Sequence, residues 1–367
     1  QEPGRRPPDG EGAGGEWLVG LYGSYADSKT PEFSNVIDYS SILPGFIYCA
    51  NNPTKERTTD FAPFGQIVLP LTDSLRFTAG LRWQYTARDF KMTINDNLFY
   101  PGNSPSISHD DSWSELMPKF VLSYQITDEH MVYASASKSF IPGGYNWASL
   151  DSRKLKYDKQ TAWTYEAGAK TSWLDKRLLV NLTLFYNDFE DMQVMHWEGP
   201  NIFDYVALNV PRASSYGAEL EISALLTQGL TLDLTAGLTE AEYDRYTKTS
   251  YDIFGNQTDK DLSGKTIQHT PKVTGNLGLT YRHPKGFFAR GQINYYGKMY
   301  WDDENDYSRN DLVTVDARIG WESESFDAYL YGRNVFGERY LVNYMPLTNV
   351  GMVAEPQVFG VEFVYKF

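Results

Sequence analysis

The chain has 367 residues, of which 41% are hydrophobic and 15% aromatic, and its formal net charge is −14. This charge argues against nucleic acid as a partner, because phosphate backbones bind basic surfaces. A membrane helix needs a run of about 18 or more apolar residues, and the sequence contains none, which excludes a helical membrane protein. Membrane-spanning strands stay open, because they need an apolar residue only at every second position.

The first 15 residues differ in composition from the rest of the chain. Residues 1–15 are rich in Pro, Gly, Arg and Glu and lack an apolar stretch like the core of a signal peptide. We therefore expect 1–15 to be a disordered or non-native start, and 16–367 to hold the folded part. The single cysteine, Cys49, allows no intrachain disulfide and no cysteine metal site.

Apolar and polar residues alternate along most of the remaining chain. The alternation is clear at 75–88, 178–187, 218–226, 230–239, 313–321 and 359–367. This period of two predicts β-strands with one apolar face, and no stretch shows a helical period. Many of these strands span about ten to eighteen residues, whereas strands of soluble proteins average about 5–6. Arg76, Arg82 and Arg88 share one face, where a water-filled lumen would accept charges that a dry core would not.

Two classes of connection separate the predicted strands. Short ones lie near 71–73, 127–130, 174–176, 227–229, 283–286 and 322–324, and long ones near 28–59, 91–112, 141–160, 196–201, 245–265, 301–309 and 337–354. The two classes alternate, which predicts an all-β, antiparallel, up-and-down transmembrane barrel with about fourteen strands in this chain. Short turns would face the periplasm, and long loops would face outward.

Several motifs resemble those of TonB-dependent outer-membrane receptors. They are SKSFIPGGYN at 137–146, TYEAGAK at 164–170, SYGAELE at 215–221, NVFGERY at 334–340 and the closing strand at 356–367. The resemblance implies the carboxy-terminal part of a barrel in the bacterial outer membrane. Because such barrels close with about 22 strands around a plug domain, we expect a partial barrel without a plug domain, with two open sheet edges.

The resemblance also implies a function. Such receptors take up bulky, scarce nutrients, most often ferric siderophores, so the implied partners are outer-membrane lipid, a bulky ligand and, only through the missing plug, the TonB complex. A passive outer-membrane pore of about fourteen strands is the alternative. The sequence has no nucleophile elbow, phosphate loop or dinucleotide fingerprint, so we expect neither an enzyme nor a cofactor.

Aromatic residues of the predicted outer loops are the candidate ligand-binding residues. They are Tyr145, Trp147, His196, Trp197, Tyr300, Trp301, Tyr307 and Tyr344. Aromatic rings with a few polar groups are suited to binding a bulky ligand, although packing within the loops would also explain them. Asp302, Glu304 and Asp306 are a candidate Ca²⁺ site, but no EF-hand pattern surrounds them and a solvated acidic loop is the simpler interpretation. The five histidines show no zinc-like spacing, so no other metal site is expected.

Overall fold

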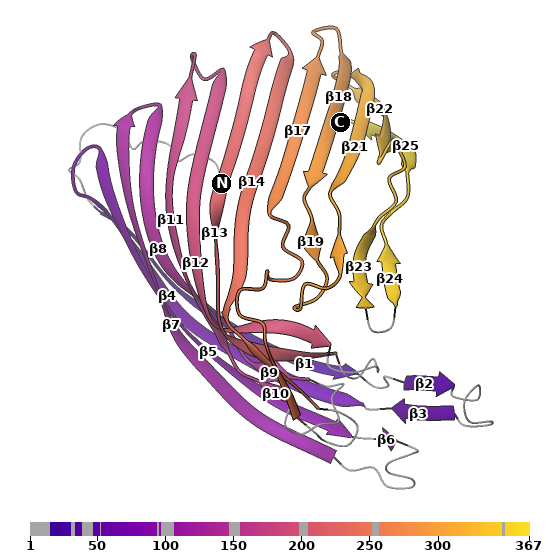
Figure 1. The fold of residues 1–367 in the computed structure, drawn as a ribbon. Helices are drawn as coiled ribbons and strands as arrows, with labels where there is room; N and C mark the ends of the chain where they lie inside the picture. Colours follow the sequence, from indigo (N-terminus) through magenta and orange to yellow (C-terminus); the bar gives the residue numbers. More distant parts are fainter. Residues whose placement is uncertain are drawn as a thin grey trace.

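One 14-stranded antiparallel sheet dominates the computed structural model of the protein (Figure 1). The structure describes residues 15–30, 34–38, 47–51, 53–93, 95–96, 106–146, 155–197, 205–251, 257–346 and 349–367. The strands of the sheet, in spatial order, are β1 (Glu16–Thr30), β4 (Thr54–Pro70), β5 (Leu75–Thr93), β7 (Ser106–Thr127), β8 (His130–Ile141), β11 (Gln160–Trp173), β12 (Leu178–Trp197), β13 (Tyr205–Thr227), β14 (Leu230–Arg245), β17 (Val273–Arg282), β18 (Phe287–Tyr296), β21 (Leu312–Glu322), β22 (Phe326–Arg333) and β25 (Val358–Tyr365). Spatial order follows chain order, which confirms the predicted up-and-down arrangement.

The sheet is strongly curved but open, and β1 and β25 form its two edges (Figure 1). Short strands lie in the long connections: β2 (Ser34–Asp38), β3 (Ile47–Asn51), β6 (Asn95–Asp96), β9 (Gly144–Tyr145), β10 (Lys156–Tyr157), β15 (Thr247–Tyr251), β16 (Gln257–Asp261), β19 (Met299–Tyr300), β20 (Ser308–Arg309), β23 (Leu341–Met345) and β24 (Val350–Val353). They gather at one rim of the sheet, opposite the short turns (Figure 1). Among the described residues there is no helix with the length and apolarity to cross a bilayer.

Several residues of the short turns have the left-handed backbone conformation, which most residue types adopt only at a cost. Leu174, Asp175 and Lys176 between β11 and β12 all have positive φ, from 55° to 65°. Gly229 between β13 and β14 has φ +81°, and a Cβ there would lie 2.1 Å from the backbone oxygen of Arg282. Glycine is required at this turn both for its left-handed conformation and for the close approach of the neighbouring strand.

The two faces of the sheet differ in polarity, as the alternation predicted. On β12, Leu182, Leu184 and Tyr186 point outward and are 42%, 52% and 42% exposed. The intervening side chains form hydrogen bonds on the inner face, where Thr183 Oγ1 lies 3.2 Å from Tyr133 Oη and Asn187 donates to Ser215 Oγ at 3.0 Å. An apolar outer face and a hydrogen-bonded polar inner face suit lipid outside and water inside.

Aromatic residues mark two levels on the outer face. Tyr165, Tyr186 and Tyr216 are paired across β11, β12 and β13, and they form one row. Trp173 lies eight residues further along β11, at the short-turn end, and is 48% exposed. At about 3.3 Å per residue the two levels are about 26 Å apart along the tilted strand. With a strand tilt of about 35–45°, this distance corresponds to about 20 Å along the membrane normal, which is comparable to the apolar band of about 25 Å between two interfacial girdles.

The face alternation reverses near the long-loop end of β12. Asp191 has a positive φ of 51°. It is not paired with Pro211, the residue opposite it on β13, although the neighbouring residues of both strands are paired. Beyond this point Val194 and His196 are buried, although Leu182 and Leu184, also at even positions, face outward. Val194 packs in a cluster with Val210, Ala213, Ala241, Tyr243, Tyr246, Leu262 and Ile267. The reversal therefore turns His196 toward the loops that cover the sheet.

Candidate functional site

A pocket of about 290 Å³ lies where the long connections meet. Its lining comes from the end of β12 (Met195, His196), from β15 (Lys248), from the stretch before β17 (Gln268, His269), from the β19–β20 loop (Trp301, Asp302, Asp303, Glu304, Asp306, Tyr307) and from β23 and the residue after it (Asn343, Tyr344, Met345, Pro346). Segments distant in the sequence thus share one cavity at the rim opposite the short turns.

The β19–β20 loop, residues 301–307, is shaped by its own polar side chains. The backbone N–H of Tyr307 donates to Asp302 Oδ1 at 2.8 Å, and that of Asp306 donates to Asp302 Oδ2 at 3.2 Å. Asn305 has φ 61°, a conformation that Asn tolerates better than most residues. Its side-chain amide exchanges two 2.8 Å hydrogen bonds with the backbone of Thr266, which fixes the loop against the stretch before β17.

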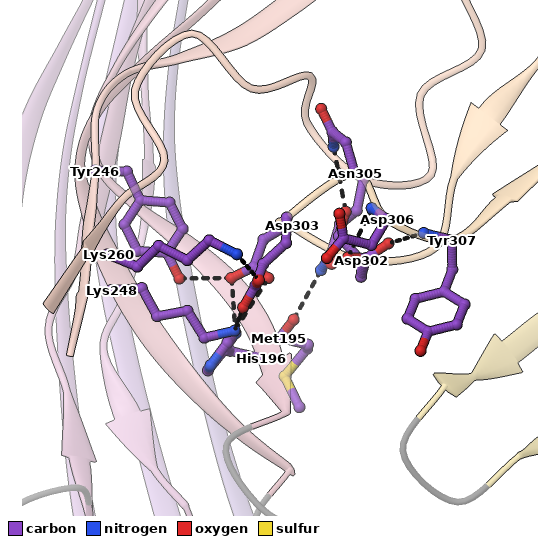
Figure 2. A network of polar contacts seen from close by, with 12 residues as sticks. Met195, His196, Tyr246, Lys248, Lys260, Asp302, Asp303, Asn305, Asp306 and Tyr307 are labelled. Atoms are coloured by element: carbon purple, nitrogen blue, oxygen red, sulfur yellow. Dashed lines mark hydrogen bonds and ion pairs between the residues drawn. The ribbon is translucent and has the colours of Figure 1, made fainter. Parts of the chain in front are cut away.

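Asp303 anchors this loop to the sheet (Figure 2). Its side chain is buried, and Oδ2 lies 2.8 Å from His196 Nδ1 and accepts a 2.8 Å hydrogen bond from Tyr246 Oη. Lys248 Nζ approaches Oδ1 at 3.4 Å. Burial alone would raise the pKa of Asp303, but the bonds from His196 and Tyr246 and the nearby Lys248 charge outweigh it and hold the pKa at about 2. Asp303 is therefore ionised at neutral pH.

Glu304 forms the second part of this anchor. It accepts a 2.7 Å bond from Lys248 Nζ and forms an ion pair with Lys260. Burial acts to raise the pKa of Glu304, and the two lysines overcome it and lower the pKa. Asp303 and Glu304 thus have their charges compensated by groups on β12 and the β14–β17 connection.

Aromatic rings form another wall of the pocket. The rings of Tyr307 and Tyr344 lie 6.0 Å apart between centroids, and Trp301 meets His269 edge to face at 5.5 Å. Burial lowers the pKa of His269, so its ring is neutral at neutral pH. Trp301 is buried, whereas Tyr307 is 47% exposed at the pocket mouth.

The structure brings together about half of the predicted ligand-binding residues. His196, Trp301, Tyr307 and Tyr344 line one pocket, and Tyr300 lies beside it with its ring 4.8 Å from Lys298 Nζ. Tyr145 lies elsewhere. It stacks on Phe90 at 4.8 Å and donates to Asp111 at 2.7 Å. Trp147 and the side chain of Trp197 lie outside the described residues.

The candidate Ca²⁺ site at Asp302, Glu304 and Asp306 is not supported by the geometry. Glu304 is bound by two lysines, and the Asp302 carboxylate accepts backbone N–H bonds from its own loop. Within the described ranges, no group of three His, Cys, Asp or Glu side chains is placed to hold a metal ion. The closely spaced carboxylates in the sequence suggested a shared cation, but in the structure Glu304 binds lysines and Asp302 accepts hydrogen bonds from the backbone of its own loop.

Several pocket residues were not predicted from the sequence. Lys248, Gln268 and His269 come from the β14–β17 connection, and no motif singles them out. His196 and His269 lie far apart in the chain, so spacing alone could not associate them. The positive charge of Lys248 beside the acidic loop is the one available signal, and it required knowledge of which loops meet.

Comparisons with known proteins agree with this arrangement. A family model described as "TonB dependent receptor-like, beta-barrel" matches residues 9–335. The pesticin receptor of Yersinia pestis is 23% identical over 331 residues, 87% of this chain and 44% of that protein. The metal-pseudopaline receptor CntO of Pseudomonas aeruginosa is 25% identical over 250 residues, 65% of this chain and 32% of that protein.

Solved structures show the same fold. The ferric yersiniabactin uptake receptor FyuA from Yersinia pestis superposes with a TM-score of 0.78 at 19% identity, covering 96% of this chain and 51% of that one. The siderophore receptor PiuA from Acinetobacter baumannii gives a TM-score of 0.75 at 17% identity, covering 95% and 53%. The chain spans about half the length of these proteins, or less.

Proposed function

Because this chain belongs to the TonB-dependent receptor-like β-barrel family, whose members are bacterial outer-membrane transport receptors, we propose that it is the ligand-gripping part of a ferric siderophore receptor. The pocket at the long-loop rim carries this proposal. It joins aromatic rings, hydrogen-bonding groups and charges from five segments of the chain, which is the composition of a small-molecule site.

The names of the relatives support the metal-chelate class. Those proteins are described as receptors for pesticin, metal-pseudopaline and ferric pyoverdine, and as an uptake receptor for ferric yersiniabactin. Three of these four names, those with metal-pseudopaline, ferric pyoverdine and ferric yersiniabactin, describe a metal complex with an organic molecule. We extend this class to the present chain, with uptake driven through TonB by a plug domain as a part of the same proposal.

The test is growth under iron limitation of bacteria that lack their own siderophore receptors and produce this protein from its natural gene. Ferric yersiniabactin, ferripyoverdine, ferric enterobactin and ferric citrate are supplied one at a time. Growth restored by at least one of them, and dependent on TonB, is expected. Trp301→Ala should reduce this growth, whereas Phe336→Ala, which removes an 81% exposed ring outside the pocket, should not.

A passive pore would give different results, both in lipid bilayers and in the growth of the same cells. A steady current through lipid bilayers that is insensitive to every ferric chelate, together with growth that does not depend on TonB, would overturn the receptor proposal in favour of a pore. Growth equally reduced by Trp301→Ala and Phe336→Ala would remove the pocket from the proposal.

A further inference from the structure

Negative charge is unevenly compensated around the pocket. The lining includes four carboxylates, those of Asp302, Asp303, Glu304 and Asp306, and one ammonium group, that of Lys248. Figure 2 shows the compensated group, Asp303 with His196, Tyr246, Lys248 and Lys260, on one side of the loop, and Asp302, Asp306 and Tyr307 on the other. One half of the site is therefore electrically balanced, and the other half is acidic.

The acidic half keeps its charge available to a ligand. Asp302 accepts backbone N–H bonds from Asp306 and Tyr307, which orient its carboxylate without cancelling its charge. Asp306 is exposed and has no ion-pair partner among the described residues. Beside these carboxylates lie the rings of Trp301 and Tyr307, and ring faces attract cations.

His196 provides an independent sign of a missing hydrogen-bond partner. Its Nδ1 lies 2.8 Å from Oδ2 of Asp303, which leaves Nε2 to find a partner of its own. The side chain is 2% exposed and lines the pocket, and Nε2 has no hydrogen-bond partner in the described part of the chain. Because a buried polar atom without a partner is costly, a ligand with a hydrogen-bonding group would be favoured here.

We propose that this pocket binds a positively charged arm of the metal chelate, a protonated amine, and that the receptor therefore prefers cationic and neutral chelates to polyanionic ones. The volume of about 290 Å³ suits such an arm and not a whole chelate. This inference rests on the proposed function and narrows its substrate class.

The test compares two chelates that differ by one ammonium group. Ferrioxamine B is a ferric trihydroxamate with a pendant protonated amine, and its N-acetyl derivative lacks that charge. We expect the protein, produced from its natural gene and placed in lipid vesicles, to bind ferrioxamine B roughly tenfold more tightly than the acetylated form. Ferric enterobactin, a polyanion, should bind more weakly than either.

Variants assign the preference to the acidic half of the pocket. Asp306→Asn and Asp302→Asn should each reduce the ferrioxamine B preference severalfold, and Asp306→Glu should retain it. Asp259→Asn removes the same charge from an exposed position on β16 outside the pocket and should leave the preference unchanged.

Four outcomes would overturn the inference. Equal binding of the two trihydroxamates, or tighter binding of ferric enterobactin, would refute the cation preference while leaving the receptor proposal intact. A preference unchanged in both Asp306→Asn and Asp302→Asn would place it outside this pocket. Failure of every ferric chelate to bind or support growth would refute the proposed function, and this inference with it.

Discussion

Asp303→Asn should release the β19–β20 loop from the sheet. The pKa of Asp303 is held at about 2, against an ordinary value of 3.8. At about 1.4 kcal/mol per pH unit, the surroundings favour the buried carboxylate by about 2–3 kcal/mol. Asn keeps the shape of the side chain but removes the charge that His196 and Lys248 face, so most of this stabilisation is lost.

Hydrogen exchange of the loop amides measures the release directly. The N–H of Trp301 donates to the Tyr307 carbonyl, and the N–H of Tyr307 donates to Asp302, so both amides report whether the loop is closed. About 2 kcal/mol corresponds to roughly 30-fold faster exchange if opening limits exchange thermodynamically. The matched control Asp306→Asn removes an exposed carboxylate without an ion-pair partner in the described chain, and should change exchange less than about twofold.

The stabilisation of the loop by Asp303 should decrease as the pH falls. Because the folded pKa of Asp303 lies below its ordinary value, its contribution is complete above about pH 4 and is lost as the pH falls toward 2. Exchange in Asp303→Asn that stays within twofold of the parent protein would refute the view that this residue holds the loop.

Three further substitutions, two of them with a matched control, test the fold and the limits of the site. Gly229→Ala should destabilise the protein in lipid vesicles toward urea by roughly 2 kcal/mol or more, since its Cβ would meet backbone 2.1 Å away, whereas Gly264→Ala, with φ +79° and nothing within 4 Å, should cost about 1 kcal/mol. Leu182→Arg should cost about 2–4 kcal/mol in the same assay, because it places a charge in lipid midway between the two aromatic levels, and Thr183→Arg on the inner face much less. Equal costs for those two arginines would contradict the assignment of the faces. Tyr145→Phe should cost about 1 kcal/mol and leave ferric-chelate binding unchanged; weakened binding would place Tyr145 in the ligand site after all.

The sheet could be predicted from the sequence because the alternation of apolar and polar residues within each strand reflects which side chains face outward and which face inward. Along 178–187 the outward residues are apolar and the inward ones mostly polar, and this pattern depends only on neighbours in the chain. The short turns follow from the same reasoning, since strands end where alternation ends. The prediction of about fourteen strands is confirmed by the 14-stranded sheet.

The site was less predictable because its parts come from different loops. Aromatic side chains in the outer loops indicated Trp301, Tyr307 and Tyr344, which line one pocket in the structure, and their binding of a ligand stays a prediction. Tyr145 shows the same composition but packs against Phe90 and Met92, so residue type alone does not distinguish a ligand site from a loop core. The short strands within the long connections were also missed, because five residues or fewer carry too little periodicity.

Tryptophan fluorescence offers the most direct measurement of ligand binding at the long-loop rim. The protein in lipid vesicles is titrated with ferric yersiniabactin, ferripyoverdine, ferrioxamine B and ferric enterobactin, and quenching is followed. At least one chelate should quench saturably, and Trp301→Phe combined with Tyr307→Ala should weaken its binding at least tenfold. Absence of saturable quenching with all four chelates, or identical binding by the double variant, would contradict a ferric-chelate site in this pocket.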